Sequence, residues 1–141
     1  MTNKKLFEYS PDELKEKLIR FYFSIGGFFG GYGSIDIVKN DNEIKYRYEH
    51  DQNIINEEYN LSLEKWQEFI NKIFDLKIYK WREKYDDNNI LDGTQWKIEM
   101  EFYGIEKSKF FSYGSNEYPY KWNEFVTIIS TYFPQMGDRR W

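Results

Sequence analysis

Apolar residues alternate with polar ones in several short stretches of the chain, a spacing typical of strands that bury one face. The alternation predicts five strands, over residues 19–25, 34–39, 43–49, 95–103 and 107–113. Asn40-Asp41-Asn42 lies between the second and third strands and predicts a β-hairpin, and Gly104 marks a turn between the last two. The polar segment 50–60 is expected to be a link, and the glycine-rich segment 26–33 a loop or a bulged strand edge.

Three other stretches repeat their apolar residues with helical spacing. Ser10-Pro11 predicts the start of a short helix that ends near residue 18, because serine caps helix ends and proline fits the first helical position. Ser62 can cap a second helix, and Pro119 is expected to open a third that Pro134 ends. The segment 76–93 is left unassigned by the pattern.

The order of these elements is helix, three strands, helix, two strands, helix. It predicts one α+β domain over residues 1–141, with a single-layer antiparallel sheet of about five strands covered on one face by about three helices. No linker, repeat or low-complexity segment divides the sequence.

Aromatic residues make up 21% of the chain, with 5 tryptophans, 13 tyrosines and 12 phenylalanines, so the chain is expected to fold rather than stay disordered. The sequence has no cysteine, which excludes disulfides and thiolate chemistry and suits a reducing cytoplasm. It has no apolar run of the length that a membrane span needs. The net charge is −4 and lysine and glutamate are interspersed, which argues against nucleic-acid binding. We therefore expect a cytoplasmic protein without membrane contact.

Three short motifs lie between residues 81 and 119. Trp81 and Tyr85 form W-x3-Y, residues 92–96 form D-G-x2-W, and residues 114–119 form G-x-N-x-Y-P. Their spacing resembles that of a group of small, uncharacterised bacterial proteins, over roughly the C-terminal half of the chain. The resemblance implies no activity, cofactor or catalytic residue.

The residues of these motifs have two interpretations. Asp92-Gly93 suits a turn and Asn116 can cap toward a helix, so packing and turn formation are the simpler explanation. Alternatively, two adjacent loops at one edge of the last hairpin frame a pocket for a ligand or a partner. The side chains that would line it are Trp81, Tyr85, Asp92, Asn116 and Tyr118.

The glycine-rich segment carries three aromatic residues, Phe28, Phe29 and Tyr32. It lacks the lysine of a phosphate-binding loop, and a predicted strand rather than a helix follows it. A bulge or hairpin is the simpler interpretation, and a contact surface for another protein is the alternative.

Few residues suggest catalysis. His50 is the only histidine and is expected at the surface. Glu99 and Glu101 share a strand face, which is the geometry of a paired-carboxylate site, but Lys97 beside them favours an ordinary solvated face. The acidic residues near Asp86 do not match a calcium-binding loop. The sequence therefore predicts no cofactor, no metal site and no catalytic residue.

We therefore expect a protein-binding module of the kind that neutralises another protein, either an immunity protein for a toxin or a phage-encoded inhibitor of a defence enzyme. One alternative is a small-molecule-binding or hydrolytic domain with its pocket near Trp81, Asp92, Asn116 and Tyr118. Another is a structural subunit that forms homo-oligomers through its sheet edge and its aromatic, glycine-rich loop.

Overall fold

The computed structural model describes residues 6–27, 31–52, 54–86, 93–105 and 109–137. The candidate binding residues Phe28, Phe29 and Asp92 lie outside the described residues.

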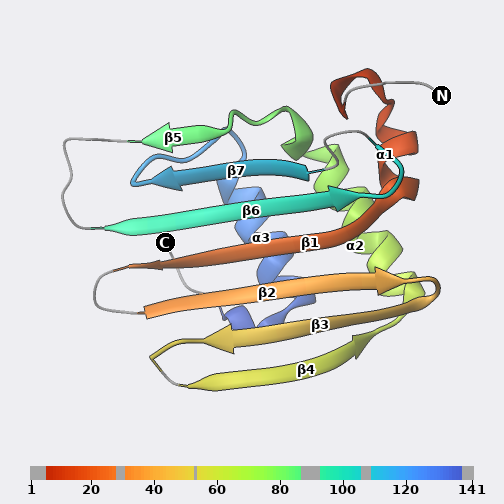
Figure 1. Ribbon diagram of the computed structural model, residues 1–141. Helices are drawn as coiled ribbons and strands as arrows, with labels where there is room; N and C mark the ends of the chain where they lie inside the picture. The colour runs from red at the N-terminus through yellow and green to blue at the C-terminus, as the bar shows by residue number, and fades with distance from the viewer. Residues whose placement is uncertain (1–5, 28–30, 53, 87–92, 106–108, 138–141) are drawn as a thin grey trace.

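The described residues form one sheet of seven strands in the order β4-β3-β2-β1-β6-β7-β5 (Figure 1). The strands are β1 (Leu18–Gly27), β2 (Gly31–Asn40), β3 (Glu43–His50), β4 (Ile55–Leu61), β5 (Lys84–Asp86), β6 (Thr94–Phe102) and β7 (Lys109–Ser115). All neighbouring strands are antiparallel except β5 and β7, which are parallel. The first half of the chain therefore forms a meander on one side of β1, and β6 closes the other side of β1.

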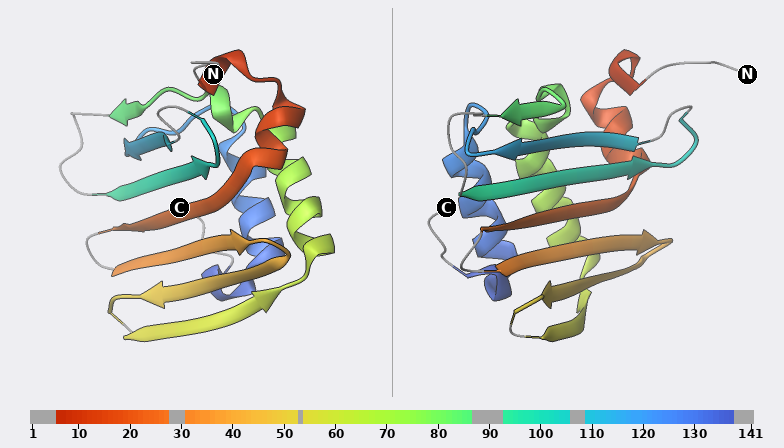
Figure 2. Two further views of the ribbon diagram at one scale, coloured as in Figure 1. Left: turned by 45° about the vertical axis from the view of Figure 1, so that its right-hand side comes forward. Right: turned by 60° about the vertical axis from the view of Figure 1, so that its left-hand side comes forward.

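Three α-helices accompany the sheet, α1 (Pro11–Lys17), α2 (Leu63–Asp75) and α3 (Trp122–Tyr132), together with short 3₁₀ helices at Leu6–Glu8, Ile78–Lys80 and Pro134–Met136. Ser10 caps α1 as expected, in a capping box where the Ser10 side chain accepts from the Glu13 backbone and the Glu13 side chain accepts from the Ser10 backbone. Helices α2 and α3 lie side by side on one face of the sheet, and none of the described helices covers the opposite face (Figures 1 and 2). In the described part of the chain, the uncovered face is thus a broad surface built from strands.

Alternation along the central strand creates the core between the sheet and the helices. Phe21 and Phe23 of β1 point toward the helices and are buried. The Phe21 ring meets Phe69 of α2 edge-on at 5.2 Å, and the Phe23 ring meets Phe125 of α3 edge-on at 5.0 Å. Such pairs contribute about 0.5–1.5 kcal/mol each beyond the burial of their area, so the aromatic residues of β1 hold both helices to the sheet.

The α+β class and the three helices agree with the sequence-based prediction. The prediction of about five antiparallel strands was only roughly right, because the sheet has seven strands and one parallel pair. The segment 50–60, expected to be a link, contains most of β4, whose polar outward residues Asn56, Glu58 and Asn60 mark an edge strand. Strand β5 is only three residues long, too short to show any alternation.

Two boundaries also differ from the prediction. The strands β1 and β2 extend into the glycine-rich segment, where Gly26 pairs with Tyr32 and Gly27 with Gly31. Helix α3 begins at Trp122 rather than at Pro119, because Lys121 adopts a left-handed conformation (φ 68°) that helical residues do not share.

Candidate functional site

A network of charged side chains occupies the middle of the uncovered face. Arg20 of β1 holds Asp36 of β2 through two hydrogen bonds, of 2.9 Å and 3.1 Å, and donates to Glu99 of β6 at 3.0 Å. Lys97 contacts the other oxygen of Glu99 at 2.7 Å. The two carboxylates and their cations thus neutralise one another across three strands.

The two glutamates of β6 that share a strand face are both part of this network. Burial opposes the charged form of Glu99, but hydrogen bonds from Lys97 and Arg20 outweigh that effect and lower the pKa of Glu99. Glu101 pairs with Lys109 of β7 at 3.2 Å. A general acid needs a raised pKa, whereas the pKa of Glu99 is lowered and both glutamates are ion-paired. These features favour a solvated, ion-paired strand face over a pair of hydrolytic carboxylates.

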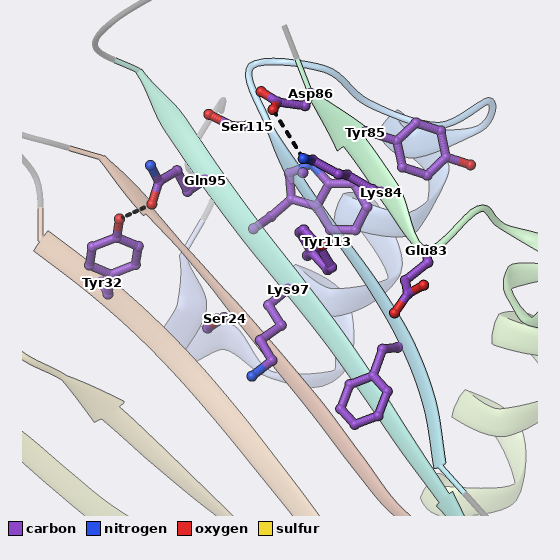
Figure 3. Close-up of a pocket in the computed structure, with 13 residues that line it drawn as sticks. Ser24, Tyr32, Glu83, Lys84, Tyr85, Asp86, Gln95, Lys97, Tyr113 and Ser115 are labelled. Atoms are coloured by element: carbon purple, nitrogen blue, oxygen red, sulfur yellow. Dashed lines mark hydrogen bonds and ion pairs between the residues drawn. The ribbon is translucent and has the colours of Figure 1, made fainter. Parts of the chain in front are cut away.

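Beside the charged network, the uncovered face is hollowed over β6, β7 and β5 (Figure 3). This first hollow has a volume of about 740 Å³. Its floor is formed by side chains that point away from the helices, among them Gln95, Lys97, Phe111 and Tyr113. Lys84 and Asp86 of β5 form its outer wall, where they pair with each other at 3.6 Å.

Three aromatic side chains are left half-exposed around this hollow. The exposed fractions are 38% for Phe111, 41% for Tyr113 and 40% for Tyr32. Their neighbours Phe110 and Ser112 on β7 are buried, so the exposed aromatics occupy strand positions where a solvated sheet face normally carries polar residues. The first hollow therefore offers an apolar, ring-lined surface.

A second hollow, of about 450 Å³, adjoins the first on the same face. It lies over β1, β2, β3 and β4, and its lining includes Tyr22, Glu49, Asp51 and Ile54. Tyr32 and Ser24 line both hollows, so the Tyr32 side chain stands between them.

Tyr32 is held in this dividing position by contacts at both ends. Its hydroxyl hydrogen-bonds Gln95 of β6 at 2.7 Å (Figure 3), and its backbone N–H donates to the Asp51 carboxylate at 2.7 Å. Gly26 of β1 lies in the same row, between its register partners Tyr32 and Gln95. A side chain at Gly26 would meet the Tyr32 ring, so the glycine makes room for the tyrosine to cross β1.

The aromatic side chains that the sequence singled out in the three motifs as candidate binding residues pack against the buried rings of Trp96 and Trp122. Trp81 is half-buried, with its ring 6.3 Å from that of Trp122. The Tyr118 ring lies 5.1 Å from Trp122, and the Tyr85 ring lies 5.7 Å from Trp96. These contacts are what a packing role requires, and only Tyr85 of these predicted site residues also lines the first hollow. Their role in binding stays a prediction.

Asn116 closes the end of the β6–β7 pair. Its side-chain oxygen accepts from the Thr94 N–H at 2.9 Å, and its own N–H donates to the Thr94 carbonyl at 2.9 Å. A Cβ at Gly93 would collide with the Asn116 side chain, so these two turn residues fit each other closely. A hollow of about 370 Å³ at the start of α3 touches Tyr118 but neither Trp81 nor Asn116. The structure therefore does not join these three residues in one described pocket.

His50 was expected at the surface, and that prediction was wrong. Its exposed fraction is 2%, because β3 continues one residue further than predicted and His50 takes the next inward position after Tyr48. Gly33 lies opposite His50 in the register, and a Cβ there would meet the imidazole and the Met136 side chain at ordinary contact distances.

Sequence reasoning missed Phe111 and Tyr113, the most exposed rings of β7. The available signal was that aromatic residues occupy both alternate sets of positions in this strand, at Phe110, Phe111 and Tyr113. In a sheet with helices on one face only, one of the two sets must remain uncovered.

Comparisons with protein-family models, with curated proteins and with solved structures found no match. The described residues contain no group of three or more histidine, aspartate and glutamate side chains placed to hold a metal ion. No helix among them has the length and apolar character needed to cross a membrane. The resemblance to small bacterial proteins stays a prediction.

Proposed function

We propose that the protein is a binding module that attaches to another protein through the first hollow on the uncovered face of its sheet. The observation that supports this function is the exposure of three ring systems, Tyr32, Phe111 and Tyr113, on a surface that no element of the described chain covers. Aromatic side chains are enriched at the centres of protein interfaces, where they supply much of the binding energy.

The polar groups around these rings support a protein partner over a small polar ligand. Tyr32 pairs with Gln95, Lys84 with Asp86 and Lys97 with Glu99. A small charged ligand that contacts these six side chains would have to break their pairs. A protein can instead cover the rings and leave the pairs intact at the rim, as interfaces with an apolar centre do.

The class of module that fits these features is an inhibitor, such as an immunity protein for a toxin or a phage-encoded inhibitor of a defence enzyme. Such a protein needs a binding surface and no catalytic group. The absence of cysteine in the sequence suits action in the cytoplasm.

The test is a pair of double variants compared in one binding assay. Phe111→Ser with Tyr113→Ser removes two rings of the first hollow, whereas Tyr103→Ser with Tyr120→Ser removes two exposed tyrosines (74% and 84%) that do not line it. A partner is isolated from host lysate on the tagged protein, purified, and titrated by calorimetry against each variant. We expect the first variant to weaken binding at least about tenfold and the control to leave it unchanged.

Circular dichroism and urea unfolding verify that both variants fold. If the folded Phe111→Ser, Tyr113→Ser variant and the control bind the partner with equal affinity, the proposed binding surface is wrong.

A further inference from the structure

The second hollow differs from the first in its charge. Among the described residues, its lining includes the two carboxylates Glu49 and Asp51 and the buried His50, and no lysine or arginine. Asp51 accepts the backbone N–H groups of Tyr32 and Gln52 but forms no ion pair within the described residues. No cation among the described residues pairs with Glu49 either, whereas Glu99 and Glu101 in the middle of the face both have cationic partners.

The nearest cation along the strand is already engaged. Arg47 points to the same face as Glu49, two residues earlier on β3, but its guanidinium donates to Asn56 at 2.5 Å and to Glu58 at 3.0 Å. No lysine or arginine of the described strands therefore forms an ion pair with the two carboxylates of the second hollow.

Two tyrosine rings line the same hollow, Tyr22 of β1 and Tyr32 of β2. The guanidinium of Arg20 lies 5.3 Å from the centre of the Tyr22 ring, so a cation already contacts one of these rings. Carboxylates together with tyrosine rings are the groups that bind the head of a lysine or arginine side chain, through charge-assisted hydrogen bonds and cation–π contact.

We propose that the second hollow receives a lysine or arginine side chain of the protein partner. This inference rests on the proposed function and names the chemistry of the partner. The partner then carries a basic residue beside the apolar residue that enters the first hollow, and Tyr32 separates the two. The net charge of −4 on the whole chain would favour the approach of such a basic surface.

The probe is a displayed library of random peptides, selected on the wild-type protein. The selected peptides are expected to be enriched in lysine or arginine next to an aromatic or aliphatic residue. Each is then synthesised and titrated against the variant Glu49→Gln with Asp51→Asn, which removes both charges and keeps an oxygen at Asp51 to accept the Tyr32 N–H. We expect affinity to fall about tenfold, since close charge pairs at interfaces have coupling energies above about 1.4 kcal/mol.

A matched control changes the same number of charges on the helical layer. Glu16→Gln with Asp75→Asn alters exposed residues of α1 and the end of α2, away from the uncovered face, and is expected to leave affinity unchanged. Replacing the basic residue of the peptide by citrulline should weaken binding to the wild type and cause little further loss in the Glu49→Gln, Asp51→Asn variant.

Two outcomes overturn the inference, and they can be told apart. If selected peptides lose affinity to Phe111→Ser with Tyr113→Ser but not to the charge variant, the first hollow binds proteins and the second does not recognise a cation. If neither variant affects them, or no peptide is selected, the proposed function fails as well.

Discussion

A single residue without a side chain shapes the centre of the candidate site. Gly26 is buried in β1 between Tyr32 and Gln95, and the hydrogen bond between those two side chains passes over it. A Cβ at Gly26 would lie 2.7 Å from the Tyr32 Cα and closer still to the Gly31 carbonyl, both of which are backbone atoms that cannot turn away. The division of the uncovered face into two hollows thus depends on this glycine.

We expect Gly26→Ala to reduce the free energy of unfolding by about 1–3 kcal/mol, because overpacking against backbone forces the strands apart. The measurement is urea unfolding followed by tryptophan fluorescence. Gly33→Ala is the matched control on the neighbouring strand, since its Cβ would meet His50 and Met136 at ordinary distances of 3.6–3.8 Å. We expect the control to change stability by no more than about 1 kcal/mol. Equal losses in the two variants would contradict the special role of Gly26.

The lowered pKa of Glu99 leads to a second prediction at the residue scale, about how the stability of the protein depends on pH. Hydrogen bonds from Lys97 and Arg20 lower this pKa in the folded protein despite burial, so the carboxylate stabilises the fold above its ordinary value of 4.5. That stabilisation is lost as the pH falls through the lowered folded-state pKa. We expect Glu99→Gln to destabilise the protein at neutral pH, and the difference from wild type to shrink as the pH falls below 4.5.

Urea unfolding of both proteins over a series of pH values measures this difference. A difference that stays constant down to the most acidic condition would show that the charge of Glu99 is not what stabilises the fold.

At the scale of elements, the sheet edge formed by β4 carries a residue that opposes self-association. Strand β4 is an exposed edge, and Glu58 is its central residue. If two copies paired antiparallel through the middle of β4, the Glu58 side chains would lie opposite each other, and like charges across strands are destabilising. This feature weakens the alternative of a self-pairing structural subunit at that edge.

We therefore expect Glu57→Thr with Glu58→Thr to increase self-association, measured by size-exclusion chromatography with light scattering over a range of concentrations. Asn56→Thr with Asn60→Thr is the control, because it introduces the same strand-forming residue at the same edge without removing charge. If the control associates equally, charge is not what protects this edge.

The elements themselves were largely accessible from the sequence. Ser10 and Ser62 cap their helices as expected, and the alternation of β1, β3 and β6 gave the correct buried face. Strand β4 was missed because Glu57 interrupts its inward apolar positions, and β5 because three residues carry no periodicity. Local patterns report local geometry, so the least regular elements are the hardest to predict.

At the scale of the whole molecule, the order of the strands determines which residues form the candidate site, and this order could not be predicted from the sequence. The candidate site combines Tyr32 of β2, Gln95 of β6, Tyr113 of β7 and Lys84 of β5, which become neighbours only through the order of the sheet. The parallel pairing of β5 with β7 joins distant segments that no alternation relates. The sequence pointed to aromatic residues near the motifs. The exposed rings instead lie on the face opposite α2 and α3, and this face is uncovered because both helices pack on the other one.

The position of β1 at the centre of the sheet also has a consequence for synthesis on the ribosome. Strands β1 to β4 can form successive hairpins as they emerge, but the other side of β1 pairs with β6, as in Phe23 with Ile98. Until β6 has been made, the nascent chain presents an open strand edge rich in phenylalanine and isoleucine, which is a template for aggregation. Cells that produce this protein would therefore benefit from a chaperone that shields β1 during translation.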